Sequence, residues 1–254
     1  MPKRRRGSNQ EEFDNESNRG GYRNTVNTQQ PKQLGMKRIT PLTKTQETVF
    51  DAFDEEMNLM LHGTAGTGKT FIALHLALKD VMTRTEYKKV VIVRSVVPTR
   101  DMGFLPGNQR EKSRVYEAPY YNICNELFGR GDAYETLKAK NAVEFITTSF
   151  IRGITLDNCI VIVDEAQNMH SMELHSIMTR VGKYCKIIFC GDTAQDDLTS
   201  ERKKELSGLE EFMQILRKMK SFKFINFVED DIVRSDLVKE YIITRNRMGL
   251  SWEG

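Results

Sequence analysis

One run of eight residues constrains this 254-residue chain more than any other feature. Residues 63–70 read Gly-Thr-Ala-Gly-Thr-Gly-Lys-Thr and match the pattern GxxxxGK[ST]. A short apolar run typical of a strand, at 57–62, precedes them, and helical periodicity over 71–83 follows. Glycines let the backbone wrap closely around an anion, and the N-terminus of the next helix attracts negative charge. The run therefore predicts a phosphate-binding loop.

The residue types in this loop assign roles to individual side chains. Lys69 is placed to span the β- and γ-phosphates of a nucleotide, and Thr70 is placed to give its hydroxyl to Mg²⁺. We expect ATP as the bound nucleotide and Mg²⁺ as its metal. The contacts with the nucleotide are expected from Gly63, Thr64, Ala65, Gly66, Thr67, Gly68, Lys69, Thr70 and Phe71.

A pair of acidic residues follows the most apolar predicted strand, at 159–163. The β-branched run 160–163 delivers Asp164 and Glu165 to the carboxyl end of that strand, where ligands bind in parallel sheets. Asp164 is expected to join Thr70 in holding Mg²⁺, and Glu165 to act as general base on the attacking water. An Asp-Glu pair after a strand is also common at helix starts, so this assignment depends on its pairing with the phosphate loop.

A third polar turn, at 191–195, ends another predicted strand at the same edge of the sheet. Its last residue, Gln195, is expected to contact the γ-phosphate or the attacking water. The alternative is an ordinary Gly-Asp turn.

Strands alternate with helices over the rest of the chain. This alternation predicts an α/β fold in which a mostly parallel sheet lies between two layers of helices, with the 159–163 strand near its centre. Thr45 is a possible cap of the first helix. The strands are expected at 57–62, 89–93, 142–146, 159–163, 185–190 and 222–227, and the helices at 43–54, 71–83, 116–127, 172–181, 209–219 and 236–247.

The first 41 residues lack hydrophobic periodicity and are expected to form a disordered tail before a single domain at 42–254. Basic residues outnumber acidic ones there by nine to four. The tail either solubilises the chain or holds phosphate backbones weakly, and nuclear targeting is a third interpretation. The basic residues are Lys3, Arg4, Arg5, Arg6, Arg19, Arg23, Lys32, Lys37 and Arg38.

Composition sets further limits. The chain is 39% hydrophobic and 29% charged, and its net charge of +3 does not by itself imply nucleic acid. No apolar run approaches the roughly 20 residues of a membrane helix, and the basic start lacks the apolar segment of a signal peptide. The four cysteines show no zinc spacing. We expect a cytoplasmic protein with reduced thiols and no membrane contact.

The polar motifs resemble those of known ATPases. Residues 164–167 and 191–195 are similar to motifs II and III of superfamily 1 helicases. Residues 91–98 followed by 103–107, 151–156 and 231–238 resemble stretches of the PhoH-like family of phosphate-starvation-associated ATPases. The resemblance runs in order from about residue 42 to 247. It implies a RecA-like P-loop core in the cytoplasm of a bacterium or of a phage-infected host cell.

The same resemblance implies roles for three more residues. Gln46 stands where related proteins read adenine, Arg234 where family members direct an arginine at phosphate, and Arg94 in a stretch that lines the nucleic-acid path of related helicases. A surface salt bridge is the alternative for each arginine.

Two functions follow as hypotheses: an ATP-driven motor or remodeller on single-stranded nucleic acid, with RNA favoured, or an ATPase switch that works with a protein partner. A nuclease is a weaker third, since no separate carboxylate cluster supports it.

The resemblance also implies assembly. Superfamily 1 helicases close a second core domain over ATP, and a single core must borrow that surface from a neighbour. We therefore expect a homo-oligomer, a hexameric ring by resemblance to other ring ATPases, in which Arg234 serves the ATP of an adjacent subunit.

Overall fold

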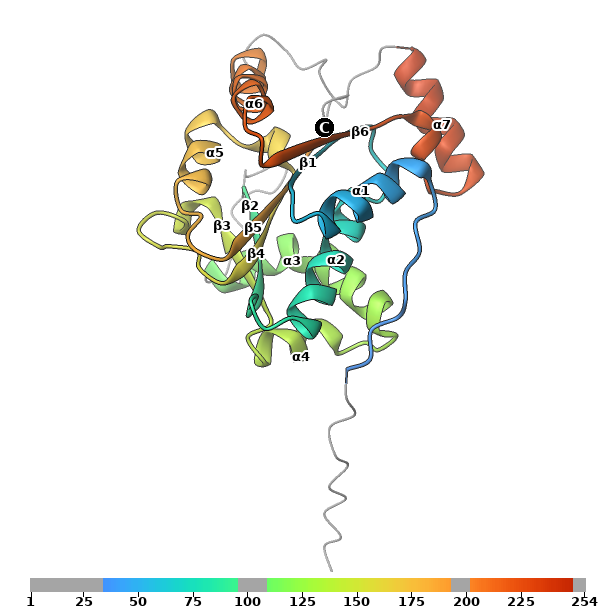
Figure 1. The fold of residues 1–254 in the computed structure, drawn as a ribbon. Coiled ribbons are helices and arrows are strands. Elements are labelled where there is room, and N and C mark those ends of the chain that lie inside the picture. The colour runs from blue at the N-terminus through green and yellow to red at the C-terminus, as the bar shows by residue number, and fades with distance from the viewer. Residues whose placement is uncertain (1–33, 96–108, 193–201, 249–254) are drawn as a thin grey trace, which may run out of the picture. The chain divides into compact units, whose positions relative to one another are not determined.

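Six parallel strands form one sheet in the computed structural model, which describes residues 34–95, 109–192 and 202–248 (Figure 1). The strand order is β3-β2-β4-β5-β1-β6, and every neighbouring pair is parallel. The expected α/β class is therefore confirmed. The strands are β1 (Asn58–Gly63), β2 (Lys89–Arg94), β3 (Val143–Thr147), β4 (Cys159–Asp164), β5 (Cys185–Cys190) and β6 (Phe222–Phe227).

Helices cover both faces of this sheet, as Figure 1 shows. One face packs against α1 (Lys44–Asp54), α2 (Lys69–Thr83), α3 (Gln109–Phe128) and α4 (Ala133–Ala139). The other face packs against α5 (Ser171–Met178) and α6 (Arg202–Arg217), while α7 (Asp236–Arg247) follows β6 and has no buried residue. The result is the predicted three-layer arrangement. Within the described ranges no helix is long and apolar enough to cross a bilayer.

The sheet divides the hydrophobic core into two clusters. Successive residues of a strand point to opposite faces, so Leu61 joins the α1–α4 side and Met60 joins the α5–α6 side. All six residues of β4 are buried, and β4 lies between β2 and β5. A strand covered on both faces needs a continuous apolar run, which explains why its sequence was the most apolar.

Several details differ from the sequence-based expectations, and α3 and α6 each begin seven residues before their expected starts at 116 and 209. Packing begins before residue 42, because Leu34, Met36 and Ile39 contact the α1–α4 core. The cap of α1 is Thr43, whose hydroxyl accepts the backbone N–H of Gln46 at 3.2 Å, so the prediction of Thr45 was wrong. Helix α4 was missed because its seven residues are too few to show a period.

The strand register brings the predicted polar turns to one edge. Arg94 at the end of β2 pairs with Asp164 at the end of β4, and Leu61 near the end of β1 pairs with Cys190 at the end of β5. Because all four strands are parallel, their carboxyl ends meet there. The residues that follow these strands are thereby brought within contact distance of one another.

A buried histidine on α2 gives the fold a pH dependence. His75 is 4% exposed, and its Nδ1 has no hydrogen-bond partner among the described residues. Burial, helped by the charge of Lys79, lowers the pKa of His75 from 6.5 to about 4. Between these values the unfolded chain binds a proton that the folded chain does not, so stability falls as the pH falls from 6.5 toward 4.

We expect His75→Leu to flatten this dependence. As the pH falls from 6.5 to 4, His75 lowers the free energy of unfolding of the wild type by at most about 1.4 kcal/mol per pH unit. The variant lacks this contribution. Thermal unfolding of both proteins at the same pH values measures the difference, because contributions of other groups cancel. Parallel stability curves for wild type and variant would contradict the assignment.

Candidate nucleotide-binding site

The phosphate loop connects β1 to α2 in a conformation that requires glycine. Gly63 has φ +108°, and a Cβ added there would lie 2.1 Å from the carbonyl oxygen of Phe227. Gly68, at φ +83°, is the N-cap of α2. Side chains are excluded from both positions, so the backbone forms an open cradle at the N-terminus of a helix. This shape fits a phosphate chain.

The chain itself holds the loop in place. The Thr67 hydroxyl donates to the Thr64 carbonyl oxygen at 3.0 Å, and the Thr64 N–H donates to the carbonyl oxygen of Phe227 at 2.9 Å. The N–H of Val233 donates to the carbonyl oxygen of Gly66 at 3.1 Å. These bonds tie the loop to β6 and to the segment after it, and they hold the cradle in shape.

Gln46 lies against the same loop. Its side chain is 3% exposed, and Nε2 donates to the Thr67 carbonyl oxygen at 3.1 Å. Its Oε1 accepts the backbone N–H of Leu42 at 2.7 Å. These contacts put Gln46 beside the loop, whereas its expected contact with adenine stays a prediction.

Lys69 is the first residue of α2, and its ammonium group points toward the phosphate loop. Nζ donates to the carbonyl oxygens of Gly63, at 3.0 Å, and Thr64, at 2.7 Å. Burial lowers the pKa of Lys69, and nearby negative charge, foremost that of Asp192, opposes the shift. The cradle therefore contains a partly desolvated cation whose donors now bind backbone oxygens and can turn to phosphate oxygens.

Thr70 and Asp164, the two residues expected to hold Mg²⁺, are in contact at the edge of the sheet. The Thr70 hydroxyl donates to Asp164 Oδ1 at 2.8 Å, and Asp164 is 4% exposed. Hydroxyl and carboxylate oxygens are the hard ligands that Mg²⁺ prefers, and protein sites usually hold it through one or two such groups together with phosphates. No group of three His, Cys, Asp or Glu that could hold a metal occurs in the described segments. The Thr70–Asp164 pair fits Mg²⁺ beside the phosphate cradle.

Tyr120 is a site residue that the sequence did not reveal. It lies on α3, is fully buried, and donates its hydroxyl to Asp164 Oδ2 at 2.8 Å. Burial raises the pKa of Tyr120, with the charge of Asp164 adding to the rise, so the hydroxyl keeps its proton. The available signal was a tyrosine on the apolar face of a predicted helix, since a buried hydroxyl needs a partner.

Glu165 is held in a strained conformation next to Asp164. Its φ of +52° lies in the left-handed region, which costs energy for a residue other than glycine. Gln167 Nε2 donates to Glu165 Oε2 at 2.6 Å, and Arg94 Nη2 lies 3.8 Å from Glu165 Oε1. Burial raises the pKa of Glu165, and the charge of Asp164 adds to this effect. A carboxylate with increased proton affinity suits a general base.

Gln167 connects this motif to the turn after β5. Its Oε1 accepts the backbone N–H of Asp192 at 2.9 Å, next to Gly191. The two polar motifs therefore meet at the predicted edge of the sheet. Gln195 itself lies outside the described residues, and its role stays a prediction.

Arg234 lies along the phosphate loop of its own chain. Its Cγ and Nε are 3.2 and 3.7 Å from the position that a Cβ on Gly66 would take, and the side chain is exposed. Arg234 is therefore close to the loop of its own chain, and its expected action on a neighbour's nucleotide stays a prediction. Among the other residues predicted to contact the nucleotide, Ala65 is partly buried, and Phe71 is partly buried against the α1–α4 core.

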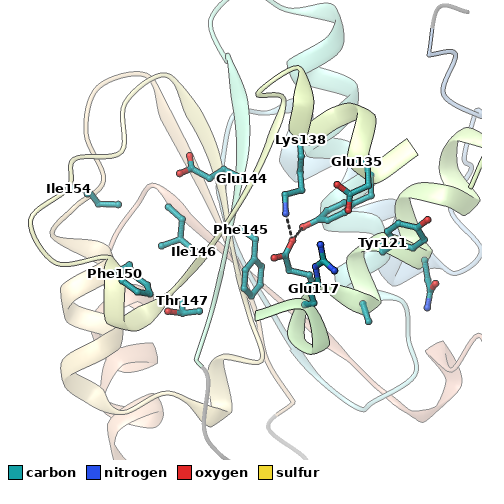
Figure 2. Close-up of a pocket in the computed structure, with 14 residues that line it drawn as sticks. Glu117, Tyr121, Glu135, Lys138, Glu144, Phe145, Ile146, Thr147, Phe150 and Ile154 are labelled. Carbon is teal, nitrogen blue, oxygen red and sulfur yellow. Dashed lines mark hydrogen bonds and ion pairs between the residues drawn. The ribbon is translucent and has the colours of Figure 1, made fainter. Parts of the chain in front are cut away.

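A separate cavity of about 1040 Å³ lies between α3, α4 and the edge strand β3 (Figure 2). Its walls carry both charges, with Lys138 Nζ 2.6 Å from Glu117 Oε2. Tyr121, the neighbour of Tyr120, lines this cavity. The predicted nucleotide-site residues are not among the described residues that line it.

Comparison with known proteins agrees with this geometry. A model of the family described as "PhoH-like protein" matches residues 38–244. A PhoH-like protein of Bacillus subtilis (strain 168) is 32% identical over 212 residues, or 83% of this chain and 62% of that protein. Protein PhoH of Escherichia coli (strain K12) is 29% identical over 188 residues, or 73% and 52%. The chain thus spans roughly half to three fifths of the length of these relatives.

Among solved structures, the large terminase of a thermophilic bacteriophage, in complex with ADP, aligns with a TM-score of 0.45 and 15% identity over 79% of this chain and 49% of that one. The UvsW helicase of bacteriophage T4 aligns with a TM-score of 0.43 and 16% identity over 76% and 62%. With the family match over residues 38–244 and a parallel sheet that carries the phosphate loop, the chain belongs to the PhoH-like family and has a P-loop NTPase fold.

Proposed function

We propose that this chain binds and hydrolyses ATP with Mg²⁺. The observation that carries the proposal is the contact of Thr70 with Asp164 beside the phosphate cradle, with Glu165 as the next residue. The loop N–H groups and Lys69 bind the phosphates, and Thr70 and Asp164 hold the metal. When bound, Mg²⁺ neutralises charge on the β- and γ-phosphate oxygens.

Glu165 supplies the base in this proposal. It accepts a proton from water as the water oxygen bonds to the γ-phosphorus, and the bond from that phosphorus to the oxygen of ADP breaks. Gln167 donates a hydrogen bond to Oε2 of Glu165, and Oε1 of Glu165 faces Arg94. The bond from Gln167 thus restrains the direction of the base.

We further propose that hydrolysis is coupled to single-stranded nucleic acid, with RNA favoured. Arg94 supports this coupling, because it ends β2 with a 21% exposed side chain and also reaches the catalytic carboxylate. A phosphate that binds Arg94 from outside therefore changes the electrostatic surroundings of Glu165. The excess of basic residues in the N-terminal 41 residues adds a weak attraction for polymer phosphates.

A second candidate is an ATPase switch that works with a protein partner. Helix α7 favours it, because Leu237, Tyr241 and Met248 on and just after this helix are 77%, 60% and 65% exposed. Apolar side chains gathered on one surface mark interaction sites in soluble proteins. The same surface supports the proposal that copies of the chain assemble as a homo-oligomer, for which a ring of six is the expected form.

Turnover of ATP with and without polymers tests these functions. We expect phosphate release to require Mg²⁺ and to rise on addition of single-stranded RNA, and to rise less with single-stranded DNA or duplex DNA. Asp164→Ala serves as the inactive control for contaminating ATPases.

Each other outcome of that assay has a clear meaning. Steady hydrolysis that no polymer changes would contradict the coupling to nucleic acid and favour the switch. Absence of Mg²⁺-dependent hydrolysis under all conditions, with ATP binding intact, would remove the ATPase assignment itself.

A further inference from the structure

The hydroxyl of Tyr120 is held in place by the core. Its ring is fully buried in the α1–α4 cluster with Cys124 and Leu127, one and two turns further along α3. The ring of Phe145 on β3 lies with its centroid 5.9 Å away. A side chain packed in this way has little freedom to move. The hydroxyl is therefore a donor at a fixed position.

The two oxygens of Asp164 have different partners. Oδ1 accepts from Thr70 on the side of the phosphate loop, and Oδ2 accepts from Tyr120 on the side of α3, each at 2.8 Å. Two donors on opposite sides fix the rotation of the carboxylate plane. Without the tyrosine hydroxyl, the bond from Thr70 is the remaining described hydrogen bond that restrains this rotation.

We propose that Tyr120 is a positioning residue of the magnesium site, whose hydroxyl orients Asp164 so that Oδ1 faces Thr70. The proposal rests on the proposed function, in which this pair holds the metal. Tyr120 touches neither metal nor nucleotide in it, and acts through Asp164. Groups that orient a metal ligand typically change metal affinity by 10- to 100-fold when they are removed.

The test is Tyr120→Phe, which removes the hydroxyl and keeps the ring in the core. Binding of a fluorescent ADP analogue is followed by anisotropy as Mg²⁺ is added, and again in EDTA. We expect the Mg²⁺ concentration for half-maximal tight binding to rise by about tenfold. Binding in EDTA is expected to match the wild type, and the melting temperature is expected to fall modestly, because a buried oxygen of Asp164 loses its donor while the ring packing is kept.

Tyr121→Phe is the matched control. Tyr121 is the next residue on α3, and its hydroxyl donates to the carbonyl oxygen of Gly131 beside the cavity of Figure 2. Like Tyr120→Phe, this variant removes one phenolic oxygen from α3, but that oxygen has no hydrogen bond with Asp164. We expect its Mg²⁺ requirement to equal that of the wild type.

Asp164→Asn separates failure of this proposal from failure of the proposed function. If Asp164→Asn raises the Mg²⁺ requirement and Tyr120→Phe does not, the positioning role is overturned and the proposed function stands. If Tyr120→Phe weakens binding equally in Mg²⁺ and in EDTA, Tyr120 supports the fold alone and the positioning role is again overturned. If Asp164→Asn also leaves the requirement unchanged, Asp164 is not a metal ligand and both proposals fall.

Discussion

Lys69→Ala abolishes ATP hydrolysis and weakens nucleotide binding, according to the geometry of the phosphate loop. The Lys69 ammonium lies inside the cradle, 2.7 and 3.0 Å from two of the loop's own carbonyl oxygens. When phosphates enter, it is the cation positioned to neutralise the β- and γ-oxygens, where charge increases during transfer. Alanine at this position keeps the helix but removes that charge. Phosphate release and anisotropy of a fluorescent ATP analogue measure the two effects.

Two comparison variants make this result specific. Lys79→Ala removes an exposed cation from the same helix, one that lies 4.0 Å from Asp54, and is expected to behave as wild type. Glu165→Gln is expected to keep ATP bound but to slow turnover by about 100-fold, the usual scale for loss of a general base. Normal turnover in Lys69→Ala would remove the phosphate-loop assignment.

The sequence indicated where most of these candidate residues lie because the motifs are local. Residues 63–70 are contiguous, so their spacing alone specified the loop, and the apolar run before Asp164 specified the strand that carries it. Thr70 and Asp164 are far apart in sequence, and their contact followed from the rule that the carboxyl ends of parallel strands meet at one edge. Contiguous motifs and sheet topology were enough for these residues.

The remaining parts depend on tertiary packing that no local pattern encodes. Tyr120 reaches Asp164 because α3 packs on the α1–α4 side of the sheet, and nothing near Tyr120 in the sequence marks this contact. Helix α4 is too short to show a period. Leu34 and Met36 look like residues of a polar tail until the surface they pack on is known. The direction of Arg234 likewise depends on how the segment after β6 folds back on the loop.

Arg234→Ala is expected to lower turnover by about 10³-fold with a smaller effect on nucleotide binding. An arginine that neutralises charge on the transferred phosphoryl group is worth about 10³ to 10⁵ in rate in P-loop enzymes. The N–H of Val233, the preceding residue, is bonded to Gly66, which fixes the backbone of Arg234 against the loop. Lys239→Ala, which removes a cation from α7, is the matched control and is expected to keep wild-type turnover.

Mixing Arg234→Ala with Lys69→Ala decides whether the arginine acts within its own chain. We propose action in cis, because Arg234 Cγ lies 3.2 Å from the position that a Cβ on Gly66 of the same chain would take. In cis, each active site in the mixture lacks either its lysine or its arginine, so activity stays at the level of the separate variants. In trans, an interface that pairs an intact loop with an intact arginine regains activity. Light scattering and differently labelled subunits establish whether copies assemble and exchange. Recovered activity in exchanged assemblies would contradict action in cis, and it would place Arg234 at the nucleotide of a neighbouring subunit.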